Sequence, residues 1–168
     1  MLVERNPINM AIHSSAASMV KESLNEMILV ADYCFGYRKD PLVWKSQGCY
    51  GFPAALLLLS VIDSIGFVIL KGSVRKHFDI LNHQDYYNLG LSKESIDIIY
   101  KNYRCMLSHN SRIAPGYWLD IGNKESSVFE FTKKGEPCLY LVPFLCLSKK
   151  VVEVFLDAIK SNKISVEC

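Results

Sequence analysis

The stretch Gly51–Leu70, GFPAALLLLSVIDSIGFVIL, decides the fold, because it is the longest apolar segment of the chain. Its length also suits a membrane span. However, Asp63 lies inside it, and a carboxylate at the centre of a bilayer costs roughly 2.5–3.5 kcal/mol. The sequence offers no second span to shelter that charge. We therefore expect a helix buried in the middle of a soluble bundle, and no membrane span.

The composition around this segment is that of a globular protein. The chain has 168 residues, of which 50% are apolar and 21% charged, so it is long enough for one domain with a real core. The net charge is +2. Domains that bind nucleic acid through bulk charge are far more basic, so the overall charge neither indicates nor excludes RNA binding.

Helical periodicity continues on both sides of the apolar segment. It predicts helices over about 15–37, 74–81, 93–109 and 148–160, with Ser14 or Ser15, Ser73, Ser92 and Ser148 as N-caps. After residue 110 the period changes, and two short runs, 128–131 and 138–142, flank TKKGEP as in a β-hairpin.

The predicted fold class is therefore mainly α. We expect a single domain over residues 1–168, with a helical bundle of four to five helices at about 14–112. A C-terminal β-hairpin and a final helix, at about 117–162, are appended to it.

No cofactor or metal is expected. The six cysteines contain no C-x-x-C pair and none has a histidine at zinc-finger spacing. His13, His77 and His83 also lack partners at ligand spacing. Residues 1–15 have no apolar core of the signal-peptide type. Together these features predict reduced thiols and a cytoplasmic location.

A second stretch, YRCMLSHN (Tyr103–Asn110), carries an arginine and a histidine five positions apart. At about 100° per residue, Arg104 and His109 lie about 140° apart and flank the face opposite the core stripe. A site on that face must be covered by something else. The cover is either a loop or a second copy of the same helix about a two-fold axis.

The chemistry of this pair suits RNA cleavage. Histidine transfers protons near neutral pH, and arginine holds a phosphate through its planar fork. Together they can cleave a phosphodiester without metal, with the RNA 2′-hydroxyl as the internal nucleophile. The alternative is an exposed arginine and a histidine that interacts favourably with the helix C-terminus.

Arg104, four intervening residues, His109 and Asn110, at the end of a late helix in a small bundle, resemble the HEPN superfamily. The helix containing LLLLSVIDSIG (Leu56–Gly66) is also similar to helices of bacterial members, and the resemblance covers about Ala16–Asn110. It implies a metal-independent endoribonuclease that acts as a homodimer, with a composite cleft between facing motif helices. Such proteins serve as toxins or in phage defence. Arg104 would orient the phosphate, and His109 would be the general base or acid.

One position departs from the family pattern. The residue after the motif arginine is usually polar, whereas here it is Cys105. A second hypothesis is therefore open: the chain is a non-catalytic HEPN-like interaction or dimerisation module that serves a neutralising or accessory protein partner. A third hypothesis is a helical domain that binds a nucleotide or another small ligand. Ser111 replaces a tyrosine that is modified in some family toxins, so that regulation is not supported.

Several residues are expected to support the pair. Asp63 should have a partner, because a lone charge in an apolar helix is costly. The candidates are Arg104 or Arg112, with Ser60 and Ser64 as the alternative. Three residues next to Arg104 or His109 in sequence would assist the pair: Ser108, Asn110 and Cys105. The cations expected to contact RNA are Lys101, Arg75, Lys76 and Arg112. A solvated helix end is the alternative for the cluster of Lys71, Arg75, Lys76 and His77.

Overall fold

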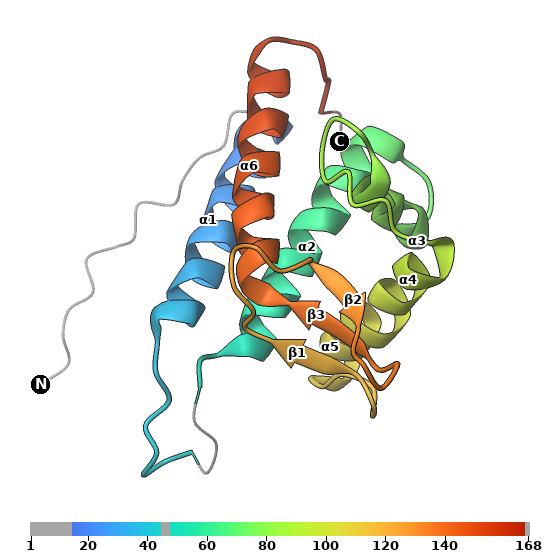
Figure 1. Cartoon of the computed structure of the whole chain (residues 1–168). Coiled ribbons are helices and arrows are strands. Elements are labelled where there is room, and N and C mark those ends of the chain that lie inside the picture. Colours follow the sequence, from blue (N-terminus) through green and yellow to red (C-terminus); the bar gives the residue numbers. More distant parts are fainter. Residues whose placement is uncertain (1–14, 45–47, 167–168) are drawn as a thin grey trace, which may run out of the picture.

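Three long helices pack side by side and form the main body of the protein in this computed structural model (Figure 1). They are α1 (Ala16–Gly36), α2 (Gly51–Leu70) and α6 (Leu141–Lys160). The structure describes residues 15–44 and 48–166. The expectations for His13, Ser14, Cys168 and the absence of a signal peptide lie outside these residues. The protein is mainly α, as the sequence predicts.

Helix α2 is the centre of the fold. Its buried residues are Ala54, Ala55, Leu58, Leu59, Val61, Ile62, Ile65 and Gly66. Among the described residues it is the one helix whose length and composition suit a membrane span. It is packed by α1, α6 and the shorter helices instead. Burial inside the protein therefore accounts for its apolar character, as expected.

Helix α1 begins at the N-cap Ser15, which forms reciprocal hydrogen bonds with Ser18. Its buried residues, Leu24, Ala31 and Cys34, face the rest of the bundle. The opposite face of α1 is exposed, and several of its large apolar side chains reach solvent. The spacing of the buried residues agrees with the predicted helix, and the expected cap is confirmed.

A second group of short helices packs against the C-terminal half of α2 (Figure 1). It comprises α3 (Val74–His77), the 3₁₀ helix η1 (Phe78–Asn82), and one continuous helical run of α4, η2 and α5. In that run α4 is Lys93–Ile98, the π-helix η2 is Ile99–Cys105, and α5 is Met106–Asn110. Ser92 caps α4 through Ser95 N–H, and Ser111, with φ 53°, ends α5. The predicted helix over 93–109 is thus present, with a wider turn in its middle.

A three-stranded sheet covers the end of the bundle near α5 (Figure 1). Its strands are β1 (Trp118–Asp120), β2 (Phe129–Phe131) and β3 (Pro137–Tyr140), in the order β1-β3-β2. The antiparallel β2–β3 pair, with Phe129 opposite Leu139, confirms the expected hairpin. The parallel strand β1, with Leu119 opposite Leu139, is an addition that sequence patterns missed. Three residues are too few to show alternation.

The last helix begins at Leu141, directly after β3, and not at the expected cap Ser148. Ser148 is fully buried in the middle of α6, where its Oγ lies 3.1 Å from the hydroxyl of buried Tyr87. The prediction was wrong because a serine that reads as a cap in sequence can equally satisfy a buried phenol. The apolar residues Leu141, Phe144 and Leu145 extend the buried face of α6 by two turns.

Tyr103 ties the helical run to the sheet. Its ring is fully buried, and its hydroxyl hydrogen is shared between two carbonyl oxygens, Trp118 O at 3.0 Å and Pro137 O at 2.9 Å. Burial raises the pKa of this phenol, so the hydroxyl stays a donor at ordinary pH. The two carbonyls belong to β1 and β3, so a single side chain anchors both parallel strands.

Replacing Tyr103 by phenylalanine should lower the free energy of unfolding by about 1–2 kcal/mol, because both carbonyls lose this donor. Urea denaturation followed by circular dichroism measures the change. Tyr117→Phe is the matched control, because the hydroxyl of Tyr117 has no partner within the described chain, and a change below about 0.5 kcal/mol is expected. Equal losses in the two variants would contradict the anchoring role of Tyr103.

Candidate functional site

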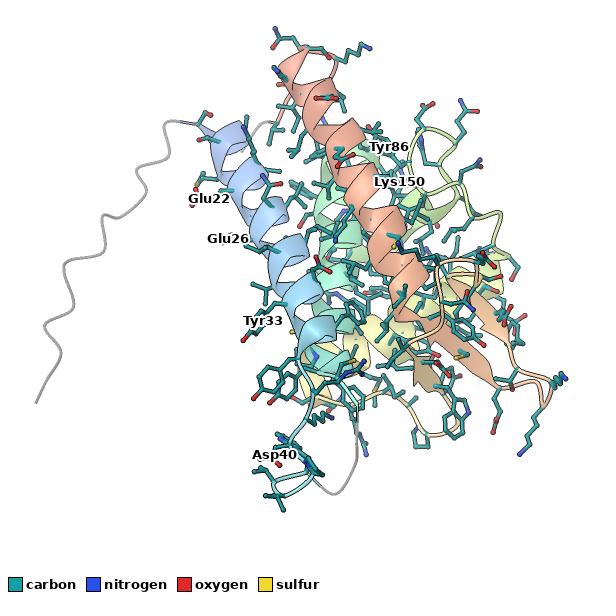
Figure 2. All side chains as sticks on the ribbon, turned by 60° about the vertical axis from the view of Figure 1, so that its left-hand side comes forward. Glu22, Glu26, Tyr33, Asp40, Tyr86 and Lys150 are labelled. Atoms are coloured by element: carbon teal, nitrogen blue, oxygen red, sulfur yellow. The ribbon has the colours of Figure 1, made fainter. Side chains whose placement is uncertain are left out.

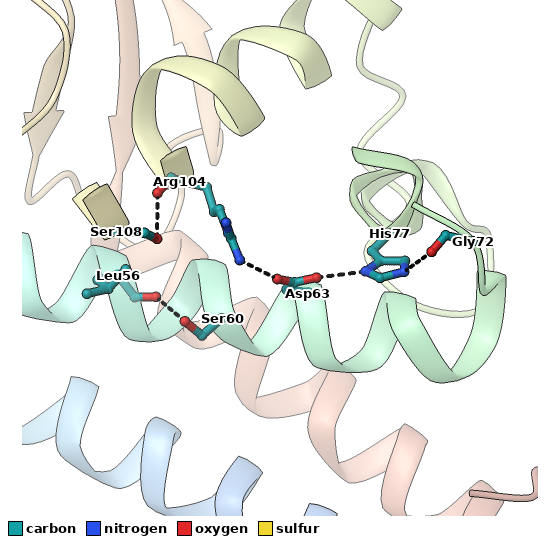
Figure 3. Close-up of polar contacts among 7 residues, drawn as sticks. All are labelled: Leu56, Ser60, Asp63, Gly72, His77, Arg104 and Ser108. Carbon is teal, nitrogen blue, oxygen red and sulfur yellow. Dashed lines mark hydrogen bonds and ion pairs between the residues drawn. The ribbon is translucent and has the colours of Figure 1, made fainter. Parts of the chain in front are cut away.

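Asp63 lies between the side chains of Arg104 and His77, where α2 meets the short helices (Figure 3). Its Oδ2 accepts a hydrogen bond of 2.8 Å from Nη2 of Arg104, 41 residues away. Its Oδ1 lies 2.7 Å from Nδ1 of His77, 14 residues away. The expected partner for this carboxylate is therefore present, and it is Arg104. Ser60 instead donates to the carbonyl of Leu56.

His77 is the residue that sequence reasoning misplaced. It was expected within an exposed basic cluster, yet only 4% of it is exposed. Its Nε2 lies 3.2 Å from the carbonyl oxygen of Gly72, which can only accept. Its Nδ1 faces the carboxylate of Asp63. The imidazole of His77 thus lies between two oxygen atoms that can accept hydrogen bonds, one of which belongs to Asp63.

A glycine makes this arrangement possible. A Cβ atom built on Gly66 of α2 would lie 2.2 Å from the carbonyl oxygen of His77 and 2.7 Å from its Cα. The backbone of α3 therefore touches the backbone of α2 at this point, which brings the imidazole to Asp63 one turn earlier in the helix. A lone glycine in an apolar helix is the one signal in the sequence that indicated close backbone packing here.

Arg104 lies in the last turn of the π-helix η2, whose wider turn is common at functional sites. Its side chain is 24% exposed. The hydroxyl of Ser108 donates to the Arg104 carbonyl, so this serine stabilises the backbone and not the guanidinium. Asp63 takes one of the five guanidinium N–H groups. Arg104 is thus held in one orientation while part of its fork still faces solvent.

His109 is exposed at the end of α5, as expected, and makes no hydrogen bond, ion pair or ring contact within residues 15–44 and 48–166. The prediction that Arg104 also flanks the outer face was wrong. Arg104 lies at the edge of the core stripe and turns toward α2, where Asp63 attracts it. In one chain the two motif residues therefore do not form a shared hydrogen-bonded site.

Cys105 lies half-buried beside Tyr100. Burial, and then the neighbouring thiol, raises the pKa of the Tyr100 phenol. The Tyr100 ring packs against Phe78, with ring centroids 5.3 Å apart. Cys105 therefore lies beside a packed aromatic side chain, and its contact is with Tyr100.

The cations expected to contact RNA fall into two groups. Lys76, Lys101 and Arg112 are exposed. Arg75 is committed to two carboxylates, Asp79 at 2.8 Å and Asp97 through its Nε. The hydrogen bond from Arg75 holds the pKa of Asp97 below its usual value, against the smaller opposing effect of burial. Arg75 thus pairs with Asp79 and Asp97 and stabilises the short helices, which leaves fewer of its N–H groups for an RNA contact.

Near the motif, Asn110 has a partner within its own helix, and the described side chains form no metal site. The amide of Asn110 lies 3.5 Å from the sulfur of Met106 in the same helix. Within the described part of the chain, no three histidine, cysteine or acidic side chains gather as a metal site. The described cysteines Cys34, Cys49, Cys105, Cys138 and Cys146 are free thiols.

No protein-family model, curated protein or solved structure matches this chain. The chemistry of the site therefore rests on its own geometry. That geometry consists of one oriented, partly exposed arginine and one free, exposed histidine on the same helical run. The half-buried carboxylate of Asp63, held by the buried imidazole of His77, supports the arginine.

Proposed function

We propose that this protein is a metal-independent endoribonuclease of the HEPN type, with Arg104 and His109 as its catalytic pair. The observation that carries the proposal is the hydrogen bond from Arg104 to Asp63, made across two helices. A guanidinium fixed in this way can meet a phosphate without losing the entropy of a free side chain. The resemblance of Arg104–Asn110 to the HEPN motif also implies a role in toxicity or phage defence.

The two residues have complementary parts in the reaction. Arg104 stabilises the negative charge that develops on the phosphate oxygens. His109 removes the proton of the RNA 2′-hydroxyl, whose oxygen attacks the phosphorus, and a second histidine or water protonates the leaving 5′-oxygen. The products are a 2′,3′-cyclic phosphate and a 5′-hydroxyl. No metal takes part in this sequence.

The proposal includes a homodimer. Arg104 turns toward α2 whereas His109 is exposed at the end of α5, so one chain offers each phosphate an incomplete set of groups. Two copies that meet along the η2–α5 run would supply two arginines and two histidines to one cleft. The exposed residues at hand for such a contact or for the RNA backbone are Lys101, Ser108, Asn110 and Arg112. Static light scattering should give the mass of a dimer, and a monomer at micromolar concentration would contradict the composite cleft.

The deciding experiment measures cleavage of mixed RNAs in EDTA. Arg104→Ala and His109→Ala should each lower the rate by at least about 100-fold, the usual contribution of a general acid or base. Lys150→Ala, at an exposed position of α6, and His83→Ala are matched controls, because they replace a cation and a histidine outside the proposed site, and their rates should stay near that of the wild type. Absence of cleavage by the wild type, or equal loss in the controls, would contradict the proposal.

A second candidate is a non-catalytic interaction module with the same dimerising helix. Cys105, which stands where a polar residue is usual, favours it. So does the modest exposure of Arg104. In this case the Arg104→Ala/His109→Ala variant would remain dimeric and would bind its protein partner as the wild type does, and neither protein would cleave RNA.

A further inference from the structure

Four aromatic side chains gather where α1 ends and the chain turns toward α2. They are Tyr33, Tyr37, Trp44 and Tyr50, which together we call the aromatic platform. The rings of Tyr37 and Tyr50 are stacked, with centroids 4.8 Å apart and planes inclined by 22°. Tyr33 continues this row at 6.3 Å, and Trp44 meets the edge of Tyr50 at 6.0 Å.

The platform faces solvent. The exposed fractions are 69% for Tyr33, 41% for Tyr37 and 43% for Trp44. Figure 2 shows Tyr33 directed away from the bundle, above the turn that carries Asp40. Exposed aromatic rings at this density are uncommon on a monomeric surface and indicate a binding site.

Backbone hydrogen bonds hold the platform in shape. The N–H of Lys39 donates to the carbonyl of Gly48 at 2.9 Å, which closes the loop. The N–H of Tyr50 donates to the carbonyl of Cys34 at 3.2 Å, which fixes the start of α2 beside the end of α1. These two contacts hold the backbone on either side of the rings, which lowers the conformational entropy that binding costs.

Positive charge accompanies the rings. The ammonium of Lys39 lies 5.2 Å from the ring centre of Trp44 and 6.0 Å from that of Tyr50. Arg38 next to it is exposed. In sequence, the stretch YRKDPLVWK has three cations and one carboxylate. The platform thus combines π-faces with groups that attract phosphate.

The C-terminal end of α1 lies at the same end of the molecule as α5 (Figure 1). A cavity of about 330 Å³ is lined by Lys39 and Gly48, beside the platform, and by Leu119, Asp120 and Ile121. Strand β1 follows α5 after a short connection.

We propose that the aromatic platform binds single-stranded RNA by stacking bases on Tyr37 and Trp44, with Lys39 and Arg38 near its phosphates. This inference rests on the proposed ribonuclease function and names the part of the substrate that the enzyme holds. The parallel offset of Tyr37 on Tyr50 is the geometry that a base would extend, since every base offers a π-face. A protein or membrane ligand would rely instead on the exposed aliphatic side chains of Leu42 and Val43, which lie beside the rings.

The test measures fluorescence anisotropy of a labelled oligouridylate in EDTA, with His109→Ala as the background so that the RNA stays intact. Tyr37→Ala and Trp44→Ala should each weaken binding about tenfold, the usual loss for one stacking ring. Tyr37→Phe and Trp44→Phe keep the rings and should bind as the background protein does. Trp118→Ala, which removes an equally exposed ring outside the platform, should have no effect.

The outcomes separate this inference from the proposed function. Binding that depends on the platform in a protein that never cleaves RNA supports the platform and overturns the ribonuclease. If cleavage and binding are unchanged in the Tyr37→Ala and Trp44→Ala variants, the platform proposal is overturned and the ribonuclease proposal stands. Loss of binding to vesicles of phosphatidylserine and phosphatidylcholine in the alanine variants, without any RNA binding, would assign the surface to a membrane. A change from dimer to monomer in those variants would assign it to a second copy of the chain.

Discussion

Substitution of Gly66 by alanine is expected to lower the free energy of unfolding by about 3 kcal/mol, the upper end of the usual cost of overpacking. The added Cβ would lie 2.2 Å from the carbonyl oxygen of His77 and 2.7 Å from its Cα. These are backbone atoms, so no side-chain rotation relieves the clash. Helix α3 must move away from α2, which also lengthens the contact between His77 and Asp63.

The clash alone makes the Gly66→Ala substitution lower the free energy of unfolding. Alanine in place of a glycine within a helix normally stabilises it by about 1 kcal/mol. Gly36→Ala is the matched control, because a Cβ at Gly36, the last residue of α1, meets nothing within 4 Å. Urea denaturation should show a stability equal to or slightly above the wild type for Gly36→Ala. A Gly66→Ala protein as stable as that control would disprove the close approach of the two helices.

Substitution of Asp63 by alanine should lower the free energy of unfolding by about 2 kcal/mol, because both Arg104 and His77 lose a charged hydrogen-bond partner. The burial of His77 makes the loss large, since water does not readily replace the missing acceptor. The side chains of Asp63 and Arg104 are 21% and 24% exposed, which limits the loss. The same denaturation experiment measures it.

Two further variants sharpen this prediction. Asp63→Asn keeps one acceptor for Arg104, and its amide can donate to Nδ1 of a neutral His77, so its loss should be smaller than that of alanine. Asp32→Ala removes a carboxylate that pairs with Lys149 at 2.8 Å on the open surface. Its effect should stay below about 1 kcal/mol. If Asp63→Ala and Asp32→Ala were equally stable, Asp63 would be an ordinary surface carboxylate.

The site depends on two features that act together, the close approach of α3 to α2 at Gly66 and the contacts of Asp63 with His77 and Arg104. Gly66 lets α3 approach α2, the approach buries His77 beside Asp63, and Asp63 in turn orients Arg104. A perturbation at Gly66 therefore reaches the motif arginine through two contacts, although Gly66 itself has no chemistry. Cleavage assays on the Gly66 and Asp63 variants would show whether catalysis depends on that orientation.

Local patterns in the sequence were sufficient for most of the secondary structure. The helical period of α1, the cap at Ser92 and the hairpin β2–β3 depend on residues that are neighbours in the chain, and each is present as predicted. The central position of α2 also follows from its sequence, because a helix that is apolar almost all round must be covered on every side. The exposed position of His109 agreed with its place in the helical period as well.

Only the tertiary structure decided which distant side chains meet. From the sequence alone, Asp63 had two possible arginine partners, and no pattern indicated that His77 would be buried away from the basic cluster. Both outcomes depend on the packing of α3 and η2 against α2, which joins residues 14 and 41 positions apart. The parallel strand β1 and the buried Ser148 have the same origin. Local propensity acts over a few residues, whereas these contacts are set by how whole elements fit together, and no short pattern records that fit.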